Sequence, residues 1–181
     1  MLNLFGGRKL GLVGLDISAS AIKLLELSGG DGGYVVESYG VEPLPENTVV
    51  EQNIVDVAAV AEAIKRLQAS TQFKSKAAAV AVAGSAVITK TIEVPAFLKE
   101  NQIEEQLLMD ADQYIPYPLD EVALDFQVLE ATARSEDMVD VLIAACRQEH
   151  IESRQAALEL SGLTPEVIDI EAHCVQRAIA L

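Results

Sequence analysis

The stretch Val13–Leu27, VGLDISASAIKLLEL, decides the fold of this chain of 181 residues. Its first half is an apolar run that ends in Asp16, and its second half is another apolar run that carries Lys23. The residues between the two runs are small or apolar, as expected for two antiparallel strands joined by a tight turn. They are Ile17, Ser18, Ala19 and Ser20.

An acid at the start of this turn and a lysine just past its end can together hold a nucleotide phosphate. Small residues at 18–20 let backbone N–H groups approach an anion closely. Lys23 adds positive charge, and Asp16 can hold Mg²⁺ through water molecules. A surface hairpin with an acid at its turn explains the same residues without any ligand, and at this point both interpretations stay open.

Composition and charge exclude several classes of function. Half of the residues are hydrophobic and 23% are charged, which is typical of a globular protein. The formal net charge of −15 repels nucleic acid, so we expect no nucleic-acid partner. No run is long and apolar enough to cross a bilayer, so we expect no direct membrane insertion. Cys146 and Cys174 lack the spacing of a metal site or a disulfide framework, which predicts reduced thiols in a cytoplasmic protein.

The N-terminal part of the chain predicts the order β-β-β-α-β. Three antiparallel strands are predicted, at 10–16, 21–27 and 34–42. Asp56 is a good N-cap for a helix that continues to about Ser70. Residues 76–83 are apolar without alternation, which predicts a strand that is buried on both faces.

After Gly84 the pattern changes to a compact β-α-β-β-α unit. Its predicted elements are strands at 87–94, 122–129 and 138–146, and helices at 99–114 and 149–161, with Gly162 as the residue that ends the last helix. A strand at 166–170 and a helix from Glu171 follow, and the helix stops in the middle of its apolar stripe, as expected for part of a longer protein. We therefore predict a core unit of residues 1–83 and 166–181, with residues 84–165 inserted as a second unit.

This order of elements resembles the first subdomain of the α/β actin-like (ribonuclease H-like) fold, with an inserted subdomain like that of FtsA-type proteins. The segment Gln113–Phe126, QYIPYPLDEVALDF, closely resembles the marker segment of the type IV pilus assembly protein PilM family. VIDIEAHCVQRAI, at 167–179, resembles the same family at the helix that connects its two domains. The resemblance covers the whole chain but only the N-terminal half of a PilM-type protein.

The resemblance implies ATP and Mg²⁺ as cofactors of the intact protein. The implied cofactor-binding residues are Asp16, Ser18, Ala19, Ser20, Lys23 and Glu171, with Asp16 on the metal side. Glu171 can orient a water at the terminal phosphate, or it can be an acid stabilised by the dipole at a helix N-terminus. Unlike the usual glycine-rich loop of this fold, residues 17–22 contain no glycine. We expect weak or absent ATP binding and no enzymatic activity in this chain, and ATP hydrolysis by the intact protein stays open.

The resemblance also implies a cytoplasmic adaptor, peripheral at the inner membrane, in type IV pilus assembly and twitching motility. Its implied partners are the N-terminal cytoplasmic peptide of PilN and other pilus assembly proteins, and an oligomer is not excluded. The peptide is expected in a groove between the core and the inserted subdomain. The candidate contacts are Val87, Ile88, Phe97, Leu98 and Ile103, of which the last three are also explained as core residues. Tyr114 and Tyr117 form either a recognition loop or the packing at a helix end.

Two other functions fit the same fold. One is a cell-division filament protein of the FtsA type, and the other is a phosphotransferase of the same superfamily. A kinase needs a catalytic aspartate over a substrate hydroxyl, and the acids of this chain indicate no pocket for one. The segment QYIPYPLDEV favours the pilus adaptor over both.

Overall fold

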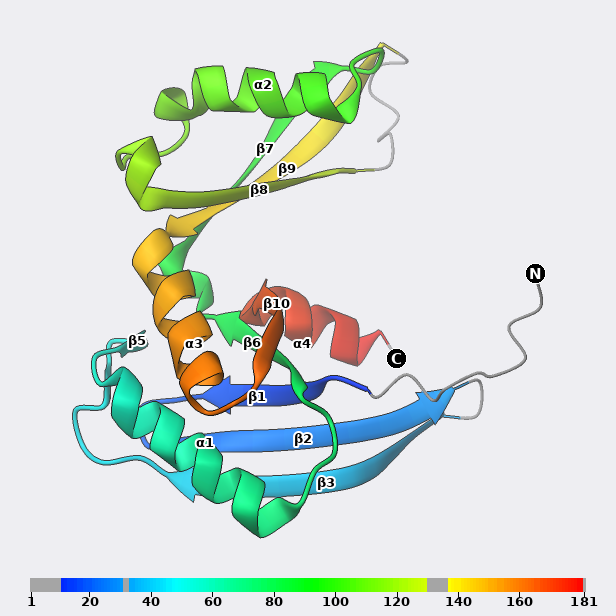
Figure 1. The fold of residues 1–181 in the computed structure, drawn as a ribbon. Helices are drawn as coiled ribbons and strands as arrows, with labels where there is room; N and C mark the ends of the chain where they lie inside the picture. The colour runs from blue at the N-terminus through cyan, green and yellow to red at the C-terminus, as the bar shows by residue number, and fades with distance from the viewer. Residues whose placement is uncertain (1–10, 31–32, 130–136, 181) are drawn as a thin grey trace. The chain divides into compact units, whose positions relative to one another are not determined.

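A computed structural model describes residues 11–30, 33–129 and 137–180. The chain is a mixed α/β protein that divides into two compact units (Figure 1). The first unit comprises residues 1–82 and 152–181, and the second comprises residues 83–151. The first boundary therefore lies one residue from the predicted one.

The first unit is built on a five-stranded sheet with the order β10-β6-β1-β2-β3. Its strands are β1 (Val13–Ile17), β2 (Ala21–Gly30), β3 (Gly33–Pro43), β6 (Ala77–Val82) and β10 (Thr164–Ile170). The predicted antiparallel pairing of the first three strands is confirmed, and β6 runs parallel to both β1 and β10. A short separate pair, β4 (Val49–Val50) and β5 (Asn53–Ile54), precedes the first helix.

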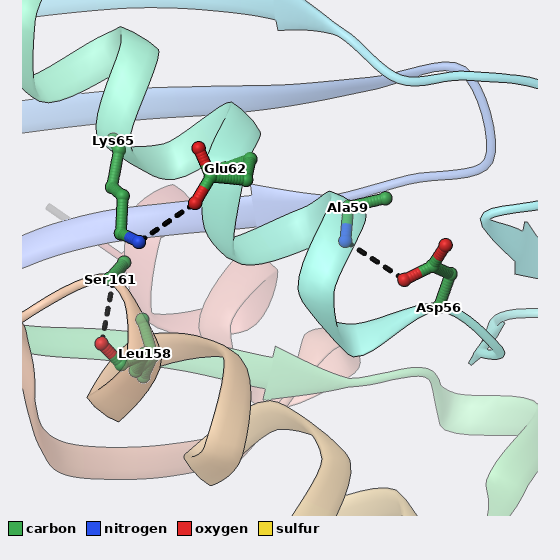
Figure 2. Close-up of polar contacts among 6 residues, drawn as sticks. All are labelled: Asp56, Ala59, Glu62, Lys65, Leu158 and Ser161. Atoms are coloured by element: carbon green, nitrogen blue, oxygen red, sulfur yellow. Dashed lines mark hydrogen bonds and ion pairs between the residues drawn. The ribbon is translucent and has the colours of Figure 1, made fainter.

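Helix α1 (Val57–Thr71) begins at its predicted N-cap. The Asp56 carboxylate accepts a hydrogen bond from the Ala59 N–H at 2.9 Å (Figure 2), which satisfies a donor of the first turn that has no partner within the helix. The helix packs on β2 and β3. A Cβ atom at Gly40 of β3 would lie 2.5 Å from Thr71 Cγ2, so glycine at this position lets α1 approach the sheet closely.

Helix α3 (Gln148–Leu160) packs on the same sheet face as α1 (Figure 1). Leu158 lies in the core that the two helices share with the sheet, and its carbonyl accepts the Ser161 hydroxyl at 2.6 Å (Figure 2). Gly162, with φ of 82°, follows the helix as predicted. The predicted second boundary is wrong, because residues 152–165 belong to the first unit and fill its core.

The other face of this sheet is only partly covered. Helix α4 (Glu171–Ile179) lies beside β10 and β6 on that face (Figure 1), and none of its residues is buried. The prediction that β6 is buried on both faces is therefore wrong. Ala78 and Val80 are buried under α1 and α3, whereas Ala79 and Ala81 are half-buried on the more open face.

The second unit has its own antiparallel sheet with the order β7-β9-β8. Its elements are the strands β7 (Val87–Pro95), β8 (Val122–Val128) and β9 (Met138–Arg147), the helix α2 (Glu100–Asp110), and the 3₁₀ turns Gly84–Ala86, Ala111–Gln113 and Leu119–Glu121. Ile103 and Leu107 of α2 pack on one face of the sheet. None of the helices within 11–30, 33–129 and 137–180 has the length and apolar character needed to cross a membrane.

Candidate functional site

An ion pair lies at the end of the first sheet where the parallel strands have their carboxyl ends. The register of β1 and β2 places Asp16 directly opposite Lys23, and Lys23 Nζ lies 2.7 Å from Asp16 Oδ2. Both side chains are about half exposed. The hydrogen bond to Asp16, followed by the charge of its carboxylate, raises the pKa of Lys23 above its ordinary value, which favours the protonated lysine.

A pocket of about 900 Å³ opens beside this pair on the partly covered face of the sheet. Asp16, Lys23 and Glu171 line it, so the structure brings together three of the residues singled out in the sequence. Apolar side chains, among them Leu25 and Tyr39, extend the lining along β2 and β3. The pocket therefore offers charged groups next to an apolar wall, the usual make-up of a site for a small ligand.

The turn between β1 and β2 does not contribute to this lining. The Ser18 N–H and the Ser18 hydroxyl both donate to the Ala21 carbonyl, at 3.1 and 2.8 Å. Ala19 and Ser20 are exposed, and residues 18–20 do not line the pocket. The Ser18 donors are thus used within the turn, and an anion would have to displace them to bind there as the sequence predicted.

The donor set around the pocket fits a hydrated magnesium ion with a phosphate group. Carboxylate oxygens and water are the ligands that Mg²⁺ prefers, so Asp16 suits the water-mediated contact expected of it. Lys23 supplies the positive charge for a phosphate. In the part of the chain that the structure describes, no group of three or more His, Cys, Asp and Glu side chains is placed to hold a metal ion directly.

Two charged residues of this pocket were not singled out in the sequence. Asp169 of β10 stands beside Ala81 of β6, and the register of β6 with β1 continues this row to Asp16. Arg177 reaches from α4 and forms an ion pair with Asp169. A usable signal was present, because Asp169 lies near the carboxyl end of a strand that follows a helix, where α/β sheets bind ligands.

Glu171 is the first residue of α4, and Cys174 lies one turn further along. The helix dipole favours an acid at this end, so both interpretations of Glu171 agree with its place. Burial raises the pKa of the Cys174 thiol, and the charge of Glu171 raises it further. Cys174 is therefore a protonated thiol of low reactivity at neutral pH, and neither Cys146 nor Cys174 forms a disulfide bond within the described residues.

The five candidate peptide contacts all lie in the second unit but differ in exposure. Phe97 is 82% exposed, whereas Ile103 is 2% exposed and fills the core under α2. Leu98 packs against the same core, and Val87 and Ile88 are half-buried on β7. Because a core side chain is not available to a partner, the expectation that Ile103 anchors a peptide is corrected, and Phe97 and β7 are left as the candidates.

The marker segment Gln113–Phe126 runs from the 3₁₀ turn after α2 into β8, and its two tyrosines face basic side chains. Lys90 Nζ lies 4.7 Å from the centre of the Tyr114 ring, and Arg147 Cζ lies 5.9 Å from that of Tyr117. Such cation–π contacts stabilise the segment against its own sheet. The packing interpretation of these tyrosines therefore has a physical basis in the structure.

A family model described as type IV pilus assembly protein PilM matches residues 14–181. The chain belongs to the PilM family. A solved structure of a PilM–PilN type IV pilus biogenesis complex contains a chain with 31% identity and a TM-score of 0.83, and the match covers 95% of this chain and 51% of that one. The cytoplasmic domain of EpsL, an inner membrane component of the type II secretion system of Vibrio cholerae, shares the fold at 15% identity and a TM-score of 0.53, over 88% of this chain and 56% of that one.

These matches confirm the predicted family and the predicted actin-like fold class. The chain spans about half the length of the solved chains it matches. The part that matches the PilM family includes every charged residue of the pocket and the whole second unit.

Proposed function

We propose that this PilM-family chain is an adaptor of the type IV pilus assembly platform that binds the N-terminal cytoplasmic peptide of PilN. The proposal places it in the cytoplasm, at the surface of the inner membrane. Its main support is the 31% identity, over 95% of the chain, to a protein solved in a PilM–PilN complex. Other pilus assembly proteins are further partners in this proposal.

The second unit offers a surface suited to such a peptide. β7 is an edge strand, so its outer backbone groups can pair with an extended peptide. Phe97 follows the strand by two residues and exposes its ring to solvent. Exposed aromatic side chains beside a free strand edge are typical anchors of peptide recognition.

Replacing Phe97 by alanine is expected to weaken binding of a synthetic PilN N-terminal peptide about thirty-fold or more, because an aromatic anchor contributes about 2 kcal/mol or more. The measurement is a fluorescence anisotropy titration of the labelled peptide with residues 1–181. Tyr34→Ala is the control, since Tyr34 is 61% exposed but belongs to the first unit. An unchanged affinity in Phe97→Ala would exclude this anchor, and no binding by the unmodified chain would contradict the adaptor role of this half.

We also propose that a longer PilM-type protein binds ATP with Mg²⁺ at the pocket of the first unit. Asp16 would hold the hydrated metal, Lys23 would contact phosphate oxygens, and Glu171 would orient a water molecule near the terminal phosphate. Bound Mg²⁺ would neutralise phosphate charge. The support is the convergence of these three side chains on one pocket.

For this chain alone, we expect the dissociation constant for ATP to lie above the micromolar range. Its charged residues would contact only one side of a nucleotide, and the Ser18 donors are already used within their turn. The matched PilM-type chain is also about twice as long as the part that this chain covers. Isothermal titration of Mg²⁺–ATP into residues 1–181 tests this expectation. A micromolar affinity would show that one half of the protein suffices.

A further inference from the structure

The ion pair between Arg177 and Asp169 joins a weakly attached helix to the sheet. Helix α4 contains no buried residue, so it has little apolar packing to fix its position. The Asp169 carboxylate is mostly buried, with 21% of the side chain exposed, and it also accepts the Ile170 N–H at 2.7 Å. The Arg177 side chain is 65% exposed and lines the pocket.

We propose that Arg177 is a second anion-binding side chain of the pocket, which Asp169 holds until a phosphate group takes its place. This inference rests on the proposed nucleotide site. Lys23 and Arg177 are the basic residues among those that line the pocket. They lie at opposite ends of the row formed by Asp16, Ala81 and Asp169, Lys23 beside Asp16 and Arg177 beside Asp169. A guanidinium binds two phosphate oxygens at once, which a lysine cannot do in the same geometry.

The exchange of partners has a consequence for α4. When a phosphate group binds Arg177, the guanidinium leaves Asp169, and α4 loses its ion pair with the strand that precedes it. An anion in the pocket is therefore coupled to the attachment of α4, because the same side chain serves both. Removing the charge of Asp169 should have the same effect on α4 and should also free Arg177 for the anion.

The chain contains a closely matched control pair outside the pocket. Arg66 of α1 forms an ion pair with Glu42 of β3, and the Glu42 side chain is also 21% exposed. Glu42→Gln changes the net charge as Asp169→Asn does, and Arg66→Gln changes it as Arg177→Gln does. Any effect of net charge alone on anion binding appears equally in both pairs.

The first experiment titrates sodium tripolyphosphate into residues 1–181 at constant ionic strength and follows amide NMR shifts around the pocket. Compared with its control, Arg177→Gln is expected to weaken binding about two- to five-fold, the range expected for one exposed charged contact. Asp169→Asn is expected to strengthen binding by a similar factor, because the competing carboxylate is gone. Equal affinities in Arg177→Gln and Arg66→Gln would overturn the inference.

The second experiment measures hydrogen–deuterium exchange of the α4 amides in the same proteins without ligand. Arg177→Gln and Asp169→Asn are expected to speed this exchange about two- to five-fold, and the two control variants are expected to leave it unchanged. Tripolyphosphate should speed α4 exchange in the unmodified chain and add nothing in Arg177→Gln. Unchanged α4 exchange in Arg177→Gln would overturn the coupling.

The two experiments separate this inference from the proposed nucleotide site. If Lys23→Met abolishes tripolyphosphate binding and Arg177→Gln does not weaken it, the nucleotide site stands and the role of Arg177 is refuted. If tripolyphosphate does not bind the unmodified chain even at millimolar concentration, both the role of Arg177 and the anion site itself are contradicted. The PilN peptide titration is independent of either result.

Discussion

Replacing Leu158 by alanine is expected to lower the free energy of unfolding by about 2–5 kcal/mol. The side chain is fully buried in the core that α3 shares with α1 and the sheet, so truncation removes apolar contacts and leaves a cavity. Urea unfolding followed by circular dichroism measures the change. The loss of unfolding free energy in Leu158→Ala tests whether α3 belongs to the core of the first unit.

Leu160→Ala is the matched control for this prediction. Leu160 lies on the same helix two residues further along and is 58% exposed, so we expect a change within about 0.5 kcal/mol. Similar costs for the two variants would contradict the assignment of α3 to this core. They would favour the boundary that the sequence pattern suggested, with this helix in the inserted unit.

Replacing Glu26 by alanine is expected to cost about 2–4 kcal/mol, because hydrogen bonds to a charged acceptor contribute more than neutral ones. The Glu26 side chain of β2 points to the helix-covered face, and the residue is 6% exposed. Its carboxylate accepts the Ser75 N–H at 2.8 Å and the Lys74 N–H at 3.1 Å. Without it, backbone donors just before β6 lose their acceptor in a partly buried place, which urea unfolding would detect.

Glu37→Ala is the control for Glu26, because Glu37 is an exposed strand residue that accepts a hydrogen bond from the exposed Ser28 hydroxyl. We expect a change within about 0.5 kcal/mol for it. Glu26→Gln keeps one acceptor oxygen, so its loss of unfolding free energy should lie between those of Glu26→Ala and Glu37→Ala. A cost for Glu26→Ala no larger than that of Glu37→Ala would show that the carboxylate does not hold the segment before β6.

Local signals in the sequence were sufficient for much of the first unit. The alternation and turn of VGLDISASAIKLLEL predicted the β1–β2 hairpin, and the pairing of Asp16 with Lys23 follows from the register of that hairpin. Asp56 predicted the start of α1, because an N-cap acts on the amides of the next turn. Such features depend on neighbours within a few residues, so a single sequence contains them.

The burial of single residues was predicted less well, because apolar character alone does not determine whether another element packs over a side chain. Ile103 and Phe97 are both apolar and only six residues apart, yet one fills a core and the other is exposed to solvent. Ala79 and Ala81 carried the pattern of a strand buried on both faces. Among the described residues, however, α1 and α3 pack on one face of the sheet and only α4 packs on the other.

The sequence by itself determined the family, the order of the elements and the acid–lysine pair of the first hairpin, because each is expressed in short motifs or in contacts across one turn. The tertiary structure alone decided that Asp169 and Arg177 join the charged pocket, and it decided the unit to which α3 belongs. Asp16 and Asp169 are separated by more than 150 residues in the chain and share a row only because β6 pairs with both of their strands. Pairing between parallel strands distant in the sequence is set by the whole sheet, which no local pattern specifies.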